Sequence, residues 1–163
     1  MQNLKLLSTF FIICLLCTCS VGVNKDLLTG LSYSYKGLSL EDAYLSVDNE
    51  EIKTNEIEYG KKVNIVLTGV KGYDLDDGKV DIGCKITVSD NEGNALISAD
   101  DAFAASHEGG LTPDQAEMLN TSLTIGKPLA INNEYKWETL FWDKNGKGTI
   151  STEITIKVIP RSE

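Results

Sequence analysis

The chain has little positive charge. It carries 15 Lys and Arg residues against 24 Asp and Glu residues, which gives a formal net charge of −9 over 163 residues. Binding to nucleic acid needs a basic face that displaces counterions, and electrostatic docking on anionic lipid needs the same sign. We therefore expect neither nucleic-acid binding nor charge-driven adsorption to a membrane.

Histidine is almost absent, and catalytic motifs are missing. His107 lies beside Ser106 and Glu108 in front of a Gly pair, where a solvated loop is a simpler interpretation than a nucleophile and its base. The chain has no Gly-x-Ser-x-Gly elbow, no Gly-rich phosphate loop and no Cys/His cluster with metal-ligand spacing. We expect a protein that is not an enzyme and needs no cofactor, with calcium as the one exception considered below.

The longest apolar run lies near the N-terminus and is too short to cross a bilayer comfortably, which takes about 20 residues. Lys5 precedes a stretch from Leu6 to Cys17 that only Ser8 and Thr9 interrupt. One cation followed by a short hydrophobic segment is typical of a secretory signal peptide.

Three of the four cysteines end this segment. The string Leu16-Cys17-Thr18-Cys19 resembles the cleavage site of a bacterial lipoprotein precursor, in which a Leu stands three residues before the Cys that becomes the lipidated N-terminus. Thr18 departs from the Gly, Ala or Ser that usually precedes that Cys. The resemblance implies lipidation of Cys19, while lipidation of Cys17 and ordinary cleavage without lipid stay open as alternatives.

This resemblance implies a division of the chain into a signal peptide (1–18), a tether (19–38) and a folded domain (39–160). The polar string "SVGVNKDLLTG" after the cysteines suits a tether between lipid and domain. It also implies export across the inner membrane and a lipid anchor, most simply in the outer membrane of a Gram-negative bacterium.

The rest of the chain alternates polar and apolar residues with a period of two. Short runs of this kind, such as Ala43–Val47 and Cys84–Val88, are separated by turn residues such as those of "NEGN". The pattern predicts an all-β, immunoglobulin-like antiparallel β-sandwich of seven to eight strands. Cys84 lies in one of these strands and is expected to be a buried small hydrophobe.

One insertion between Asp100 and Asn120 breaks the strand pattern. Thr112 is a predicted N-cap, Pro113 the first helical residue, and Gln115 the second partner of a capping box. We expect a short helix that closes one end of the sandwich and turns three side chains to the core: Ala116, Met118 and Leu119.

The segment around Tyr135 favours the immunoglobulin-like class. Leu129 precedes Tyr135 by six residues, and Tyr135 opens a strand. This arrangement resembles the tyrosine corner of immunoglobulin-like and fibronectin type III-like domains, in which the Tyr hydroxyl bonds back to the preceding corner. Alternation then places Tyr135, Trp137, Thr139 and Phe141 on one face, which we expect to be the core.

The string "DKNGKGTI" from Asp143 to Ile150 partly matches an EF-hand loop. Lys147 and Ile154 stand where oxygen ligands are required, so the calcium interpretation fails. The pair Asn145-Gly146 instead predicts a tight hairpin turn with positive φ at both positions, joining the last two strands.

Two weaker candidate sites remain. Asp74, Asp76 and Asp77 concentrate carboxylates in one loop and form a calcium candidate, although Asp-Gly is also a common turn. Trp142 lies on the strand face opposite Trp137 and is a candidate binding residue, although packing under a neighbour is commoner.

Together these features predict a lipid-anchored binding or assembly module of the cell envelope, such as an accessory lipoprotein of an envelope or secretion machine. Its partners would be the membrane, through the N-terminal lipid, and another envelope protein. The alternative is a surface glycan-binding β-sandwich lipoprotein.

Overall fold

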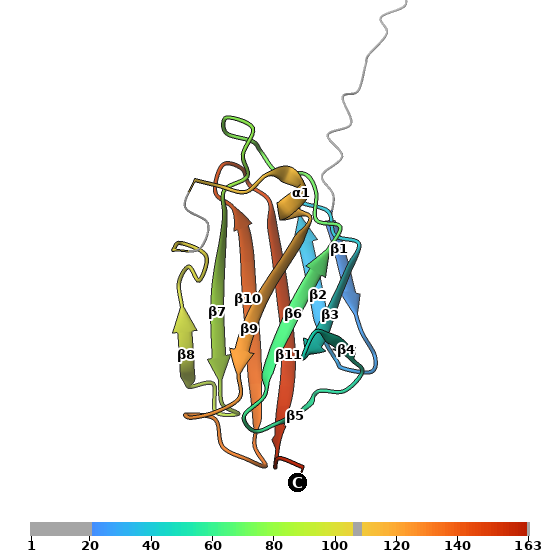
Figure 1. Cartoon of the computed structure of the whole chain (residues 1–163), viewed down its shortest axis with the longest axis vertical. Coiled ribbons are helices and arrows are strands. Elements are labelled where there is room, and N and C mark those ends of the chain that lie inside the picture. Colours follow the sequence, from blue (N-terminus) through green and yellow to red (C-terminus); the bar gives the residue numbers. More distant parts are fainter. Residues whose placement is uncertain (1–20, 106–108, 163) are drawn as a thin grey trace, which may run out of the picture.

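The computed structural model describes residues 21–105 and 109–162, which form an all-β, immunoglobulin-like sandwich of two sheets with one short helix (Figure 1). This confirms the predicted fold class. The described residues contain eleven strands instead of seven or eight, because the sequence did not predict four of them: Val21–Lys25, Ser32–Lys36, Glu50–Ile52 and Glu56–Glu58.

The larger sheet has seven strands. Its path runs β1 (Val21–Lys25), β2 (Ser32–Lys36), β11 (Thr149–Ile159), β10 (Glu134–Asp143), β7 (Ile82–Ser89) and β8 (Ala95–Ala99), with β5 (Glu56–Glu58) beside the end of β11. Neighbours on this path are antiparallel, and β5 is parallel to β11.

The smaller sheet is antiparallel and has four strands in the order β4 (Glu50–Ile52), β3 (Asp42–Val47), β6 (Lys62–Thr68) and β9 (Met118–Thr124). The chain passes from the smaller sheet to the larger one between β4 and β5. As a result β3 pairs with β6 in the smaller sheet, whereas β5, which begins shortly after β4 ends, pairs with β11 in the larger sheet.

The core lies between the two sheets and follows the predicted alternation. Tyr135, Trp137, Thr139 and Phe141 of β10 are all buried, as expected, and Phe141 packs on Phe103 with ring centroids 5.8 Å apart. One polar pair lies among these apolar groups.

That pair consists of Thr139 of β10 and Thr152 of β11, which are opposite each other in the sheet. Their hydroxyl oxygens are 2.7 Å apart, and both residues are buried. Each hydroxyl therefore has the other as its hydrogen-bond partner at a buried position.

The tyrosine corner is present. The hydroxyl of Tyr135 accepts a hydrogen bond of 2.7 Å from the backbone N–H of Ala130, five residues earlier. This contact fixes the turn that leads into β10, and it confirms the interpretation of this segment.

The helix α1 (Pro113–Ala116) begins as predicted and is one turn long. Thr112 caps it, with its hydroxyl accepting from Gln115 N–H and the Gln115 side chain accepting from Thr112 N–H at 2.9 Å. Ala116 and Leu119 are buried, but the prediction for Met118 is wrong, since it opens β9 with its side chain exposed.

No helix among the described residues is long and apolar enough to cross a membrane.

The predicted tether of residues 19–38 is wrong for the part that the structure describes. Val21–Lys25 and Ser32–Lys36 pair as the antiparallel hairpin β1–β2, and β2 then pairs with β11. The physical reason is in "SYSYK", where alternation turns Tyr33 and Tyr35 inward, and the ring of Tyr35 covers Gly22 of β1. Among the described residues, the folded domain therefore begins at residue 21 instead of residue 39.

Candidate functional site

The outer face of the larger sheet carries an open depression of about 430 Å³. It extends over five neighbouring strands, from β1 to β7. Its polar lining consists mainly of side chains that alternation turns away from the core. Four of them are hydroxyl groups: Ser32, Ser34, Thr87 and Ser151.

Two carboxylates lie opposite each other in this depression. Glu138 of β10 and Glu153 of β11 are direct cross-strand partners, an arrangement that repels when both are ionised. Lys136 relieves the repulsion, because its Nζ lies 2.9 Å from a carboxylate oxygen of each. The hydrogen bond to Glu138, followed by that to Glu153, raises the pKa of Lys136.

The apolar part of the depression comes from Val23 of β1 and Leu140 of β10. Both side chains are exposed, and Val23 has 81% of its surface in solvent. Lys85, opposite Leu140 in β7, also lines the depression and forms a 3.8 Å ion pair with Asp100. The surface thus offers hydrogen-bond donors, acceptors and small apolar contacts over a wide area.

Trp142 lies on the same outer face, next to this depression but outside its lining. It is the cross-strand partner of Gly83, and a Cβ built on Gly83 would lie 2.1 Å from its Cζ2 atom. The indole therefore lies over the glycine and is half-buried. Trp142 thus has the packed position that the sequence analysis gave as the alternative to a binding role. Part of its ring nevertheless remains in solvent.

The three acids of the calcium candidate do not converge. The segment from Asp76 to Lys79 is a tight turn, with backbone hydrogen bonds in both directions and positive φ at Asp77 and Gly78. Asp74 donates its N–H to the carboxylate of Asp143 at 2.7 Å. Over the described part of the chain no three His, Cys, Asp or Glu side chains gather as a metal site would require, and calcium binding stays a prediction.

The hairpin between β10 and β11 is confirmed, but its predicted turn is wrong. Asn145 and Gly146 have no positive φ, and the loop closes instead through a backbone bond from Asp143 N–H to Gly148 C=O at 2.9 Å. The cause is Asp143, whose buried carboxylate accepts from the N–H of Asn145 and of Asp74. Because Asp143 binds these two N–H groups, the loop is longer than the predicted two-residue turn.

An ion-pair cluster joins this hairpin to two other loops. Lys144 Nζ lies 3.2 Å from Asp81 and 3.0 Å from Asp101. Burial alone would raise the pKa of Asp101, but hydrogen bonds from Lys144 and from the N–H groups of Cys84 and Phe103 outweigh it and lower the pKa. Asp101 therefore fixes the end of β8 to β7.

Cys84 offers no reactive group. Burial raises the pKa of the Cys84 thiol to about 12, so the thiolate is not formed at neutral pH, and the expected buried role is confirmed. His107 and Ser106 lie outside the described residues, as do Cys17 and Cys19.

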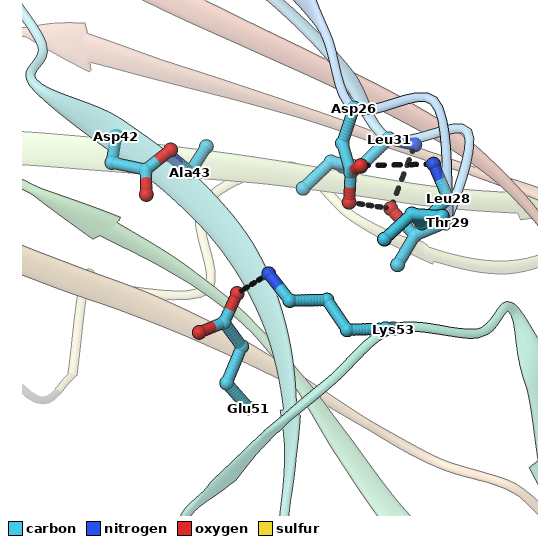
Figure 2. A network of polar contacts seen from close by, with 8 residues as sticks. All are labelled: Asp26, Leu28, Thr29, Leu31, Asp42, Ala43, Glu51 and Lys53. Atoms are coloured by element: carbon cyan, nitrogen blue, oxygen red, sulfur yellow. Dashed lines mark hydrogen bonds and ion pairs between the residues drawn. The ribbon is translucent and has the colours of Figure 1, made fainter.

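The loop between β1 and β2 carries Leu27 and Leu28, and Figure 2 shows the hydrogen bonds of Asp26, Leu28, Thr29 and Leu31 that hold its turn. The Asp26 carboxylate accepts from Leu28 N–H at 2.9 Å and from the Thr29 hydroxyl at 2.7 Å, and that hydroxyl accepts from Leu31 N–H. Leu27 and Leu28 have 90% and 66% of their surface exposed. An apolar pair held rigidly in solvent is typical of a contact surface.

Comparisons with known proteins support the fold. No protein-family model matches the chain, and no curated protein matches it in sequence. Among solved structures, the crystal structure of the C-terminal domain of wzt is similar, with a TM-score of 0.50 and 15% sequence identity over 77% of this chain and 75% of that chain. At this identity the similarity concerns the fold alone.

Sequence reasoning missed the depression, although its residues were visible as the outward half of each strand. The alternation in "SYSYK" and "TISTE" separates inward residues from outward Ser and Glu residues. The missing information was strand order, which brings Ser34 of β2 beside Ser151 of β11.

Proposed function

We propose that this protein is a non-enzymatic binding module of the bacterial cell envelope, and that it binds a glycan on the outer face of its seven-stranded sheet. The observation that carries the proposal is the depression that joins four hydroxyls, two carboxylates and two apolar side chains.

The lining suits a carbohydrate for a chemical reason. Sugar hydroxyls both donate and accept hydrogen bonds, and Ser and Thr hydroxyls do the same, while Glu138 and Glu153 accept only. Val23 and Leu140 give the ring carbons a surface for dispersion contacts. An open depression also fits a chain of sugars better than an enclosed small-molecule pocket would.

A glycan array with the exported full-length protein tests this function. Ser151→Arg places a long cation in the middle of the depression and should lower affinity at least tenfold. Ser98→Arg is the matched control, because Ser98 lies on the same face in β8, outside the lining. Absence of glycan binding, or equal binding by both variants, would reject the proposal.

Trp142→Ala separates two versions of the site. If the indole extends the depression, this variant loses affinity for longer glycans only. If binding is indifferent to the change, Trp142 has a packing role over Gly83 and the depression acts without it.

We also propose that the protein is anchored by lipid on Cys19 after removal of residues 1–18, in the outer membrane of a Gram-negative bacterium. The support is the signal-like run and the string that ends at Cys19. Growth with labelled palmitate should label the wild type and not Cys19→Ala. Label that survives in Cys19→Ala but disappears in Cys17→Ala would move the anchor to Cys17.

A protein partner within an envelope machine is the second candidate function. The exposed pair Leu27–Leu28 on its rigid turn favours it. A photo-crosslinking residue at Leu27 should capture one specific envelope protein in intact cells, whereas one at the exposed Leu75 should not. Equal labelling from both positions would show random contact and count against this candidate.

A further inference from the structure

The strand β9 is a free edge of the smaller sheet. It pairs with β6 alone, and the described residues provide no backbone hydrogen bond to its other side. The N–H group of Ile125, just past the strand, donates to Lys61 C=O at 2.8 Å in register with the β6 pairing. By alternation, the odd-numbered residues direct their backbone groups toward β6.

The even-numbered residues of β9 consequently direct their N–H and C=O groups away from the sheet: Met118, Asn120, Ser122 and Thr124. Three of these, Met118, Asn120 and Ser122, line a hollow of about 450 Å³ beside the edge. Phe103 and Leu111 form part of its apolar wall. The edge thus combines a row of backbone hydrogen-bonding groups with an adjacent apolar recess.

This edge has none of the usual protection against pairing with another strand. Exposed edges generally carry Lys, Pro, a bulge or an inward charge. The sequence of β9 is "MLNTSLT", without charge or proline, in a chain with 24% charged residues. By contrast, the edge strand β4 is three residues long and carries Glu50 and Glu51.

We propose that a second copy of this chain covers the edge, with the two β9 strands antiparallel about a two-fold axis at Thr121. In this register Asn120 lies opposite Ser122 of the second copy, and Met118 lies opposite Thr124. Only outward-directed backbone groups meet, so each free N–H finds a C=O. The row of β9 side chains that faces the core continues across the interface, with Leu119 opposite Leu123 of the second copy.

Charge at the strand ends favours the same arrangement. Asp114 and Glu117 precede β9, and Lys127 follows it. An antiparallel pair brings the acidic end of one copy to the basic end of the other. A parallel pair would place like charges together in two acidic chains.

The interface is independent of the proposed glycan site. The depression and the hollow beside β9 share no lining residue. A dimer of this kind leaves both depressions open, so two weak sites would act on one extended ligand with raised avidity.

Sedimentation of the exported full-length chain tests the dimer. The wild type should be a dimer and Ser122→Lys a monomer with an unchanged circular dichroism spectrum, because the new cation lies on the edge and outside the core. Ser98→Lys is the matched control on the edge strand of the other sheet and should remain dimeric. A monomeric wild type, or a dimer that only Ser98→Lys separates, overturns the proposal.

Cysteine pairs test the register. Opposite residues of a hydrogen-bonded antiparallel pair have Cα atoms about 5.5 Å apart, within disulfide range, whereas Cα atoms more than about 7 Å apart are not bridged. The double variant Asn120→Cys/Ser122→Cys should therefore form an intermolecular disulfide under oxidation, and each single variant should not. Cross-linking by either single variant would mean a different register and would reject the two-fold axis at Thr121.

Discussion

The buried hydroxyl pair of Thr139 and Thr152 predicts that each single variant is less stable than the wild type, whereas the double variant is not. Replacing either residue by Val keeps the shape but leaves the other hydroxyl buried without a partner. Such an orphaned group costs about 1–3 kcal/mol, whereas exchanging both partners for apolar groups of equal shape is close to neutral. We therefore expect each single variant to lose about 1–3 kcal/mol of the free energy of unfolding.

The double variant Thr139→Val/Thr152→Val should lie near the wild type, so the two changes couple instead of adding. Urea unfolding followed by Trp fluorescence measures all four proteins, with the shift in midpoint read at constant m-value. In thermal unfolding each single variant should melt about 2–4 °C lower per kcal/mol lost.

Single variants that each lose less than about 0.5 kcal/mol, with a double variant that loses their sum, would contradict this expectation. That result would mean that each hydroxyl has another partner and that the 2.7 Å contact is incidental. A double variant that is less stable than both single variants would refute it equally.

Three further outcomes are expected. Tyr135→Phe removes the hydroxyl that accepts from the Ala130 N–H and should cost about 1 kcal/mol in urea unfolding. Because the pKa of Asp101 is lowered by folding, its stabilisation is present above its ordinary pKa near 3.8 and is lost as pH falls below it, so Asp101→Asn should flatten the acid limb of a melting-temperature profile. Gly83→Ala should displace Trp142 and shift its fluorescence to the red, whereas Gly126→Ala, with no atom within 4 Å of the new Cβ, should leave the spectrum unchanged.

The fold class was predictable because most of it depends on local patterns. The alternation around Trp137 fixed which face of β10 is buried, and the capping box at Thr112 fixed where the helix begins. These signals act within a few residues of the chain. The corner at Tyr135 is also local, since donor and acceptor are five residues apart.

The errors came from contacts between distant segments. The hairpin at residues 21–36 is polar and glycine-containing, and it becomes part of the sheet only by pairing with β11. The turn after Asp143 depends on a hydrogen bond from Asp74, 69 residues away. The depression likewise needs strand order. The local pattern contains the alternation in "SYSYK", but it does not say which strand this segment joins, because the residues that decide the pairing lie elsewhere in the chain.

The position of β11 has a consequence for how the chain assembles. It is the last strand of the described residues, yet it lies inside the larger sheet, with β10 on one side and β2 and β5 on the other. Ser32 and the backbone of Glu153, which touch in the finished sheet, are 121 residues apart. Contacts across such distances form late and slow folding. A nascent chain therefore holds the hairpin β1–β2 without a sheet to join until its final strand has been synthesised.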